Sequence, residues 1–419
     1  MEINKILKYL ILIFSFSIPL IGFNIPKYVL GALILVKILS LFKKQSKFLG
    51  YIILNKKTIF LLTLYFLYIT VTLFYSDNTK QALQTIQKLS YFLIFPLLLS
   101  GLETEKYFTI RKVLNLFLFG VLFLEATNIF LILIEYFAAL YLDNRTTIDV
   151  NIFFYQNLSE RVKLHPGYYS LMVFIAFWIN FYNPNSKIKN VIALIQVIFL
   201  MLLATRIIIF TFLLCFLFVL VKQLKKQLKR VIATLIVVII LLASFGKTNL
   251  KNQFRLNNFN NSKQIITTEI EAGLEIKTKK ISNDLIARVY QIKCSLQAIL
   301  ENKQSFFYGY GAGDYKNVLE QKYKLSNFEW GLQQEFNSHN QYLTTMLMGG
   351  LIGLIFFILY ILTPLFLGVI HEKLFYYKIL TLFLIYALTE SYLLREAGVL
   401  ILSFFISLVT ILNMAKQKN

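Results

Sequence analysis

Long apolar runs, separated by mostly short polar connections, recur along the whole chain. About twelve of these runs reach or approach the ~20 residues that a helix needs to cross a ~30 Å hydrocarbon core. The runs are continuous rather than alternating, which favours membrane helices over membrane strands. We expect these helices near residues 6–23, 27–42, 59–75, 89–101, 113–137, 166–182, 191–205, 207–221, 231–245, 341–370, 378–392 and 398–413.

One polar stretch, residues 246–340, is much longer than the other connections. It lies between the ninth and tenth expected helices and contains segments with helical spacing. The pattern therefore predicts three parts, which are nine N-terminal membrane helices in residues 1–245, a large and partly helical outward loop in residues 246–340, and three C-terminal membrane helices in residues 341–419. The predicted fold class is an all-α polytopic membrane protein.

Composition and charge support this fold class and orient the chain. With 57% hydrophobic residues, the chain has too little polar sequence to cover the surface of a soluble protein of this length. Roughly half of its 43 Lys and Arg residues lie in short loops on one side, which by the positive-inside rule places both termini in the cytoplasm. Topology and anionic membrane lipids account for the net charge of +22, so it does not indicate nucleic-acid binding.

The sequence contains no pattern that holds a metal or a cofactor. It has three histidines and two cysteines, Cys215 in an expected helix and Cys294 in the large loop, with no metal-ligand spacing among them. The glycines at 309, 311 and 313 lack the preceding strand that a dinucleotide or phosphate-loop motif requires. We therefore expect neither a metal nor a cofactor.

The apolar segment 191–221 is interrupted by Arg206. As one helix the segment would be about 46 Å long, which exceeds a single membrane crossing. Both of its flanks are basic, so the chain must turn back near Arg206. A lone arginine at that depth costs about 2–3 kcal/mol unless it is paired. It therefore binds an anionic ligand or pairs with a distant acid such as Glu390, and both alternatives stay open at this point.

The boundary between the loop and the tenth helix has the pattern of a helix start. Ser338 followed by Gln341 predicts a capping box, with Ser338 as N-cap and His339 in the first turn. The N-terminus of a helix binds anions and disfavours a protonated imidazole. His339 would then be a neutral base beside an anion site, with Ser338 and Asn340 as neighbouring binding groups. The alternative is a histidine that only caps a membrane helix.

Other basic residues lie near the outer ends of expected helices. Arg288 lies on a predicted loop helix whose apolar stripe is Leu285, Val289, Ile292, Leu296 and Ile299, with Arg288, Gln291 and Ser295 on the other face. The pair Arg161 and His165 precedes the sixth expected helix. In the last outward loop, Glu390, Arg395 and Glu396 are close enough in sequence to pair with one another, which is a structural role.

Four segments together resemble the O-antigen ligase and polymerase superfamily of bacterial membrane glycosyltransferases. They are SHNQYLTTMLMGGLIG at 338–353, ARVYQIKCSLQAILENKQSFFYGYGAGDY at 287–315, the Thr205–Arg206 pair and TESYLLREAG at 389–398. The resemblance covers roughly residues 160–410. One departure is Thr205, where the family commonly has Ser.

The resemblance implies a specific activity and location. The family transfers a glycan, without a metal, from an undecaprenyl-diphosphate donor to an acceptor hydroxyl, such as one on lipid A–core or on a growing glycan. His339 resembles the family's essential loop histidine, and Arg288 and Arg206 resemble its diphosphate-contacting arginines. His165 and Arg161 are further candidates for substrate binding. The resemblance also implies the inner membrane of a bacterium, contact with membrane lipids, and an active site that faces the periplasm.

Three other functions compete with ligation. A polymerase of repeat units and a protein O-oligosaccharyltransferase share the family, and one sequence does not separate them from a ligase. A non-enzymatic flippase or transporter for lipid-linked glycans belongs to another class. Transporters tend to have repeated halves and broken helices near the midplane. This chain shows neither pattern and places its candidate residues at one outer surface, which favours an enzyme.

Overall fold

The computed structural model describes residues 3–42, 52, 55–102, 107–142, 150–183, 188–223, 284–367 and 373–417. Within these residues the regular elements are helices, so the prediction of an all-α fold is confirmed there. The helix expected at 231–245 and the first part of the large loop lie outside the described residues. The division into three parts stays a prediction.

Six segments have the length and composition of membrane spans: Ile3–Phe23, Ile25–Phe42, Lys56–Tyr75, Thr79–Leu99, Ile110–Ala138 and Gln341–Phe366. They comprise α1 (Ile3–Ser17) with η1 (Ile18–Phe23), α2 (Ile25–Phe42), α4 (Lys56–Val71) with η2 (Thr72–Tyr75), α5 (Thr79–Leu89) with α6 (Tyr91–Leu99), α7 (Ile110–Leu142) and α19 (Gln341–Phe366). The fourth segment begins earlier than the sequence pattern indicated, because α5 continues almost directly into α6 and Asn78 caps its start. A multi-pass membrane protein follows from these helices.

Shorter apolar helices complete the bundle. They are α9 (Pro166–Phe181), α10 (Lys189–Leu203), α11 (Arg206–Gln223), α20 (Lys373–Tyr386) and α21 (Glu396–Gln417). Of these, α9 is buried from Pro166 to Asn180, and α21 is buried from Val399 to Leu412. A helix that is apolar on all sides is stable only where other helices or lipid surround it. Both helices therefore form the centre of the bundle, with α7, α10, α11 and α20 packed on α9.

The expected break at Arg206 is confirmed. Helix α10 ends at Leu203, and Ala204 adopts a left-handed conformation with φ 47° before α11 begins at Arg206. The hydroxyl of Thr205 lies 2.8 Å from that of Ser170 on α9. This contact fixes the outer end of α11 beside the start of α9.

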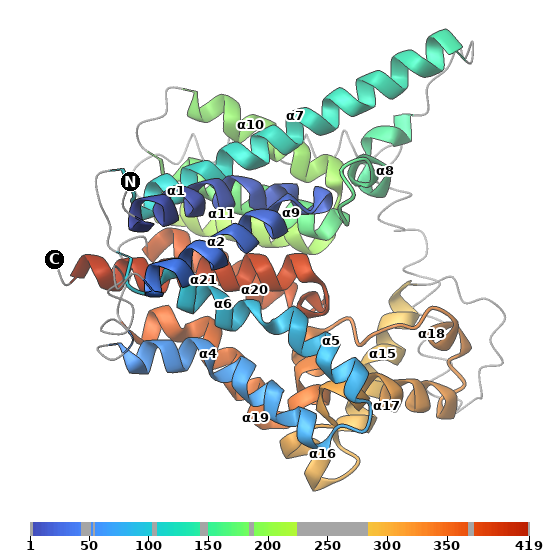
Figure 1. The fold of residues 1–419 in the computed structure, drawn as a ribbon. Helices are drawn as coiled ribbons and strands as arrows, with labels where there is room; N and C mark the ends of the chain where they lie inside the picture. The colour runs from blue at the N-terminus through green and yellow to red at the C-terminus, as the bar shows by residue number, and fades with distance from the viewer. Residues whose placement is uncertain are drawn as a thin grey trace.

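The described part of the large loop folds into helices at one end of the molecule. These helices are α15 (Asp284–Ile299), α16 (Lys303–Tyr308), α17 (Gly311–Leu325) and α18 (Glu329–Gln333), and the connection before α9 contains η3 (Val150–Phe153) and α8 (Tyr155–Glu160). Figure 1 shows both termini at the opposite end of the bundle from α15, α17 and α18. The Asp314 carboxylate accepts the backbone N–H groups of Asp77 (2.7 Å) and Asn78 (3.0 Å), which ties α17 to the start of α5.

The face of α15 that carries Gln291 and Ser295 packs against the rest of the protein. These two residues are 2% and 0% exposed, whereas Ile292 and Leu296 of the apolar stripe are each 41% exposed. The physical reason is the size of the side chains. The face that packs on α17 and α19 also carries Ala287, Cys294 and Ala298, and small residues allow close helix contact.

A glycine kink in α19 connects the loop to the bundle. Gly350 interrupts the helix with φ 61° and ψ −161°, and a Cβ built there would lie 2.2 Å from the carbonyl carbon of Phe307. The carbonyl of Leu347, just before the kink, accepts the N–H of Tyr310 at 2.8 Å. Two other glycines of α19, Gly349 and Gly353, contact Tyr68 of α4, as expected of a small-residue face.

We predict that Gly350→Ala destabilises the protein by about 1–3 kcal/mol, because the new side chain meets backbone atoms and the left-handed conformation is costly for alanine. Gly31→Ala is the matched control, since a Cβ there has nothing within 4 Å. It should change stability by no more than about 1 kcal/mol. Thermal unfolding in detergent measures both, and equal melting temperatures for the two variants would contradict the prediction.

Candidate functional site

Two connecting segments lie against each other, residues 337–343 at the start of α19 and residues 387–393 between α20 and α21. The backbone N–H of Gln341 donates to the carbonyl of Ala387 (2.7 Å), and the N–H of Leu393 donates to the Gln341 side chain (2.8 Å). The N-cap of α19 is Asn340, whose side chain accepts the N–H of Leu343 at 3.0 Å. The predicted capping box at Ser338 is therefore wrong, and His339 lies before the helix rather than in its first turn.

Three buried hydroxyl groups hold these two segments together. Ser338 lies 2.5 Å from Thr344 and 3.3 Å from Ser391, and Thr344 lies 2.7 Å from Ser391. Their exposed fractions are at most 4%. The Ser391 hydroxyl also accepts the N–H of Asn340 at 3.1 Å. Ser338 therefore has a structural role. If either segment moved, its buried hydroxyl would lose its hydrogen-bond partners.

His339 has an unusual backbone conformation. Its φ of 43° lies in the left-handed region, which non-glycine residues rarely occupy. The strain is supported by a 2.7 Å hydrogen bond from its backbone N–H to the Asn337 side chain. Because Ser338 and Asn340 fix the residues on either side, the imidazole has a defined direction. Such supported strain is typical of functional sites.

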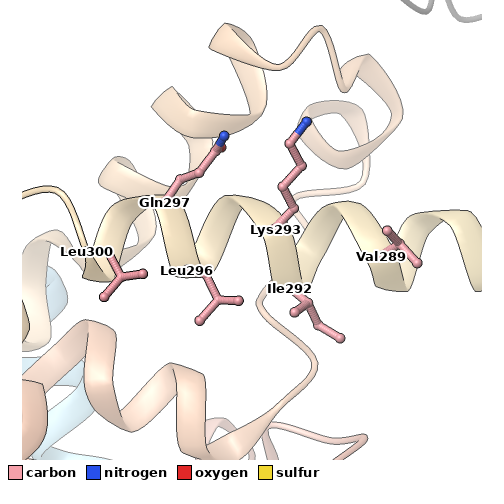
Figure 2. A pocket seen from close by; sticks show the side chains of 6 residues that line it. All are labelled: Val289, Ile292, Lys293, Leu296, Gln297 and Leu300. Atoms are coloured by element: carbon pink, nitrogen blue, oxygen red, sulfur yellow. The ribbon is translucent and has the colours of Figure 1, made fainter. Parts of the chain in front are cut away.

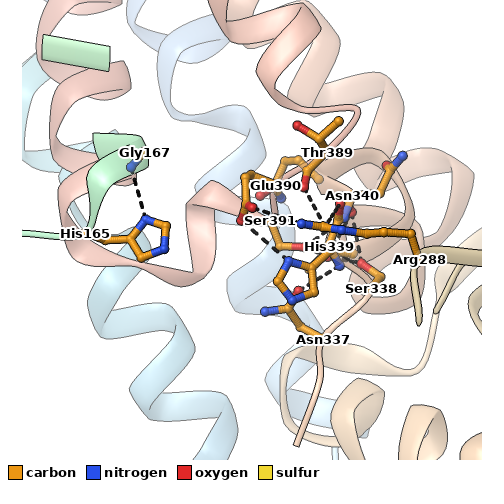
Figure 3. Close-up of polar contacts among 12 residues, drawn as sticks. His165, Gly167, Arg288, Asn337, Ser338, His339, Asn340, Thr389, Glu390 and Ser391 are labelled. Atoms are coloured by element: carbon orange, nitrogen blue, oxygen red, sulfur yellow. Dashed lines mark hydrogen bonds and ion pairs between the residues drawn. The ribbon is translucent and has the colours of Figure 1, made fainter. Parts of the chain in front are cut away.

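Glu390 connects His339 to Arg288. One carboxylate oxygen lies 3.3 Å from the Arg288 guanidinium and the other lies 3.6 Å from His339 Nδ1. Arg288 also donates to the backbone carbonyls of Thr389 (2.7 Å) and His339 (3.4 Å). Figure 3 shows these side chains gathered where the two segments meet. Three parts of the chain that are distant in sequence thus converge on one carboxylate.

The electrostatics of Glu390 keep it ionised. Burial by itself would raise the pKa of Glu390, but the contact with His339 and the positive charges around it outweigh burial and lower that pKa. A carboxylate facing Nδ1 favours the tautomer with the proton on that nitrogen. Nε2 is then free to accept a proton. The 3.6 Å separation is longer than a hydrogen bond and is of the kind that tightens when substrate binds.

His165 also faces this region, from the start of α9. It caps that helix through Nδ1, which accepts the N–H of Gly167 at 3.2 Å. Burial lowers the pKa of His165, with Arg395 and His339 acting in the same direction and Glu390 opposing them. The imidazole is therefore neutral at pH 7, and because Nδ1 is an acceptor, Nε2 carries the proton and can donate a hydrogen bond.

Two of the predicted site residues have other surroundings. Arg161 forms an ion pair with Glu135 at 2.5 Å and donates to backbone carbonyls of Ile152 and Asn157. These contacts stabilise the connection before α9 and do not involve His339. Arg206 is exposed at the first residue of α11. Glu390, the acid considered as a partner for Arg206, contacts Arg288 and His339.

The last outward loop also differs from expectation. Glu396 pairs with Lys27 of α2 at 2.8 Å and accepts the hydroxyl of Tyr91 at 2.6 Å. Glu390 contacts Arg288, so the predicted pairing among Glu390, Arg395 and Glu396 is wrong. No local pattern predicts these partners, because each acid contacts residues that are far away along the chain. The sequence pointed to Glu390 only as a possible partner of Arg206 and as a member of the segment 389–398.

A shallow apolar hollow lies apart from this cluster, on the outward face of α15. Its lining, drawn in Figure 2, consists of Val289, Ile292, Lys293, Leu296, Gln297 and Leu300. Within the described parts of the chain, no group of three or more His, Cys, Asp or Glu side chains could hold a metal ion. The polar side chains gathered at the candidate site are Arg288, His339 and Glu390, with His165 nearby.

Comparison with known proteins identifies one family. The family model described as O-antigen ligase matches residues 191–358, which run from α10 to α19 and contain Arg206, Arg288 and His339. No curated protein matches the chain.

We predict that the contribution of Glu390 to stability depends on pH. Because its pKa is lowered from the usual 4.5, the ionised carboxylate stabilises the folded protein above that pH and loses this effect as the pH falls through the lowered pKa. Glu390→Gln should thus reduce the melting temperature at pH 7 and have less effect near pH 4. Glu320→Gln, at a 3.9 Å ion pair with Lys316 on α17, is the control, and its effect should change little with pH. A Glu390→Gln effect that is constant with pH would contradict the prediction.

Proposed function

We propose that the chain is an O-antigen ligase-like glycosyltransferase, a proposal supported by the match of residues 191–358 to the O-antigen ligase family model. The donor is a glycan on undecaprenyl diphosphate, and the acceptor is a hydroxyl group of lipid A–core or a similar glycan. Transfer inverts the anomeric carbon and requires no metal. The observation that carries this proposal is the Glu390 carboxylate between Arg288 and His339.

Glycosyl transfer from a lipid diphosphate needs a proton acceptor for the incoming hydroxyl. His339 Nε2 takes the proton of the acceptor hydroxyl as its oxygen forms a bond to the anomeric carbon. Glu390 faces Nδ1, so it orients the ring and stabilises the imidazolium that forms. The carbon–oxygen bond to the diphosphate breaks at the same time on the opposite face of the sugar. The proton then returns from His339 to solvent or to the released diphosphate.

The leaving group also needs stabilisation, because undecaprenyl diphosphate gains negative charge as the bond breaks. Arg288 lies beside the base, and preorganised guanidinium groups stabilise such charge strongly in a site with little water. Arg206, at the outer start of α11, is the second candidate for this role. The hydroxyl contact between Thr205 and Ser170 holds it beside α9.

The other predicted binding residues act mainly through position. Ser338 and Asn340 fix the backbone on both sides of His339, and we assign them the role of aiming the imidazole. His165 offers its Nε2–H to the substrate. The contacts of Arg161 with Glu135 support a structural role at the connection before α9.

The arrangement of the bundle supports a periplasmic site in the bacterial inner membrane. Both termini lie at one end and α15, α17 and α18 lie at the other, which agrees with cytoplasmic termini and an outward site (Figure 1). A lipid-linked donor diffuses in the membrane, so its diphosphate would meet the protein at the outer ends of the helices. Arg288, His165 and His339 lie near those helix ends.

We predict that His339→Ala abolishes transfer, by a factor of about 10²–10⁴ if the histidine acts as a general base. The measurement is lipopolysaccharide banding in a deletion strain complemented with wild type or variant. Ligase activity predicts that long glycan disappears from lipid A–core and accumulates on undecaprenyl diphosphate. Glu335→Gln, at an exposed ion pair of the same loop, should restore the wild-type ladder.

Other banding patterns would change the proposal. Core carrying a single repeat unit in the His339→Ala strain would identify a polymerase. An unchanged ladder, with glycan missing from a protein instead, would identify a protein O-oligosaccharyltransferase. A His339→Ala protein that is present at the normal level and transfers glycan normally would contradict the assignment of His339 as the base.

A further inference from the structure

The charge of Arg288 is already balanced within the protein. Its guanidinium lies 3.3 Å from the ionised Glu390 carboxylate and donates to two backbone carbonyls. The pair therefore has no net formal charge. Each phosphorus of a diphosphate esterified at both ends carries one negative charge, and more charge develops as the sugar leaves. Further positive charge is needed at the site, since an anion held away from water requires compensation.

Arg395 is positioned to supply it. The residue lies between η4 (Tyr392–Leu394) and α21, five positions after Glu390, and its side chain is exposed. Among the residues that the structure describes, no carboxylate lies within ion-pair distance of its guanidinium. The adjacent acid, Glu396, is occupied by Lys27 and Tyr91. The positive charge of Arg395 is thus available to a ligand.

Contacts through Tyr168 place the Arg395 backbone near His165. The rings of His165 and Tyr168 are 6.0 Å apart. A Cβ built at Gly398, whose N–H donates to the carbonyl of Arg395, would lie 3.1 Å from the Tyr168 ring. After burial, the positive charge of Arg395 also contributes to the lowered pKa of His165. His165 Nδ1 is occupied by the Gly167 N–H, so the nitrogen left for a ligand is the donor Nε2–H.

The loop holds Arg395 in place. The N–H of Leu393, two residues before it, donates to the buried side chain of Gln341 at 2.8 Å. The N–H of Arg395 itself donates to the carbonyl of Tyr392 at 3.3 Å. Gln341 is the first residue of α19. The same contacts that position His339 thus also position the backbone that carries Arg395.

We propose that Arg395 and the Nε2–H of His165 form a diphosphate-binding subsite of the candidate active site, in addition to Arg288 and Arg206. This inference rests on the proposed glycosyl transfer. Arg395 binds the donor diphosphate and stabilises the charge that develops on it when the glycosyl–oxygen bond breaks. His165 donates a hydrogen bond to the same anion. Arg395 thereby replaces the positive charge that Glu390 neutralises on Arg288.

The test uses the purified full-length chain in lipid nanodiscs, with a lipid-linked glycan donor and a separate acceptor. The variants are Arg395→Gln, Arg395→Lys and, as a control for loss of an exposed positive charge elsewhere, Lys324→Gln on α17. Arg395→Gln should lower kcat/KM for the donor by roughly ten- to a hundredfold. It should also weaken inhibition by inorganic diphosphate about tenfold, and leave the KM for the acceptor unchanged. Arg395→Lys should retain part of the activity, and Lys324→Gln should behave as wild type.

Two results would overturn the proposal. The first is unchanged donor kinetics and unchanged diphosphate inhibition in Arg395→Gln. The second is a change confined to the KM for the acceptor, which would assign Arg395 to an anionic group of the acceptor. If Arg395→Gln does not fold, the same comparison is made between wild type and Arg395→Lys. A wild-type protein that transfers no glycan would contradict the proposed function itself, whereas an active wild type with an unaffected Arg395→Gln contradicts only the subsite.

Discussion

The candidate site depends on one interaction. The Glu390 carboxylate contacts the Arg288 guanidinium and the His339 imidazole, which come from distant parts of the chain. Glu390 follows α20, Arg288 is on the loop helix α15, and His339 precedes α19. If Glu390 were absent, the Arg288 charge would repel a protonated His339, and the ring would lose the group that faces Nδ1. The contact therefore sets both the charge balance of the site and the direction of the His339 imidazole.

The structure around Glu390 explains how so few contacts can fix the geometry. Ser338, Thr344 and Ser391 share buried hydroxyl hydrogen bonds, so the segments that carry His339 and Glu390 cannot separate without leaving polar groups unsatisfied. The kink at Gly350 then joins α19 to the loop, which lets α15 approach the site. A rigid site at the outer ends of membrane helices suits a substrate whose lipid part stays in the bilayer.

Most of the fold could be predicted from the sequence, because membrane helices need long apolar runs and those runs are visible in one dimension. The break at Arg206 could be predicted for the same reason, from length and flanking charge. The burial of Gln291 and Ser295 on α15 could not be predicted, since it depends on small neighbours that fit against α17 and α19. In a membrane, apolar side chains can also face lipid, so an apolar stripe does not by itself show which face of a helix is buried in the protein.

The candidate site could be predicted only in part. The roles of His339, Arg288 and Arg206 came from local context and family resemblance, and contacts of the first two now support them. The N-cap at Asn340 was missed because Ser338 and Asn340 are both good capping residues, and the partner loop decides between them. Glu390 and Arg395 were expected to pair with each other, and only the folded chain shows that Glu390 belongs to Arg288 and His339.

The most direct measurement is a double-mutant cycle on the transfer rate, with wild type, Glu390→Gln, His339→Ala and the double variant. If Glu390 acts through His339, Glu390→Gln slows transfer in the wild-type background and has little further effect on the residual rate of His339→Ala. An equal slowing by Glu390→Gln in both backgrounds would contradict the account, because the carboxylate would then act independently of the histidine.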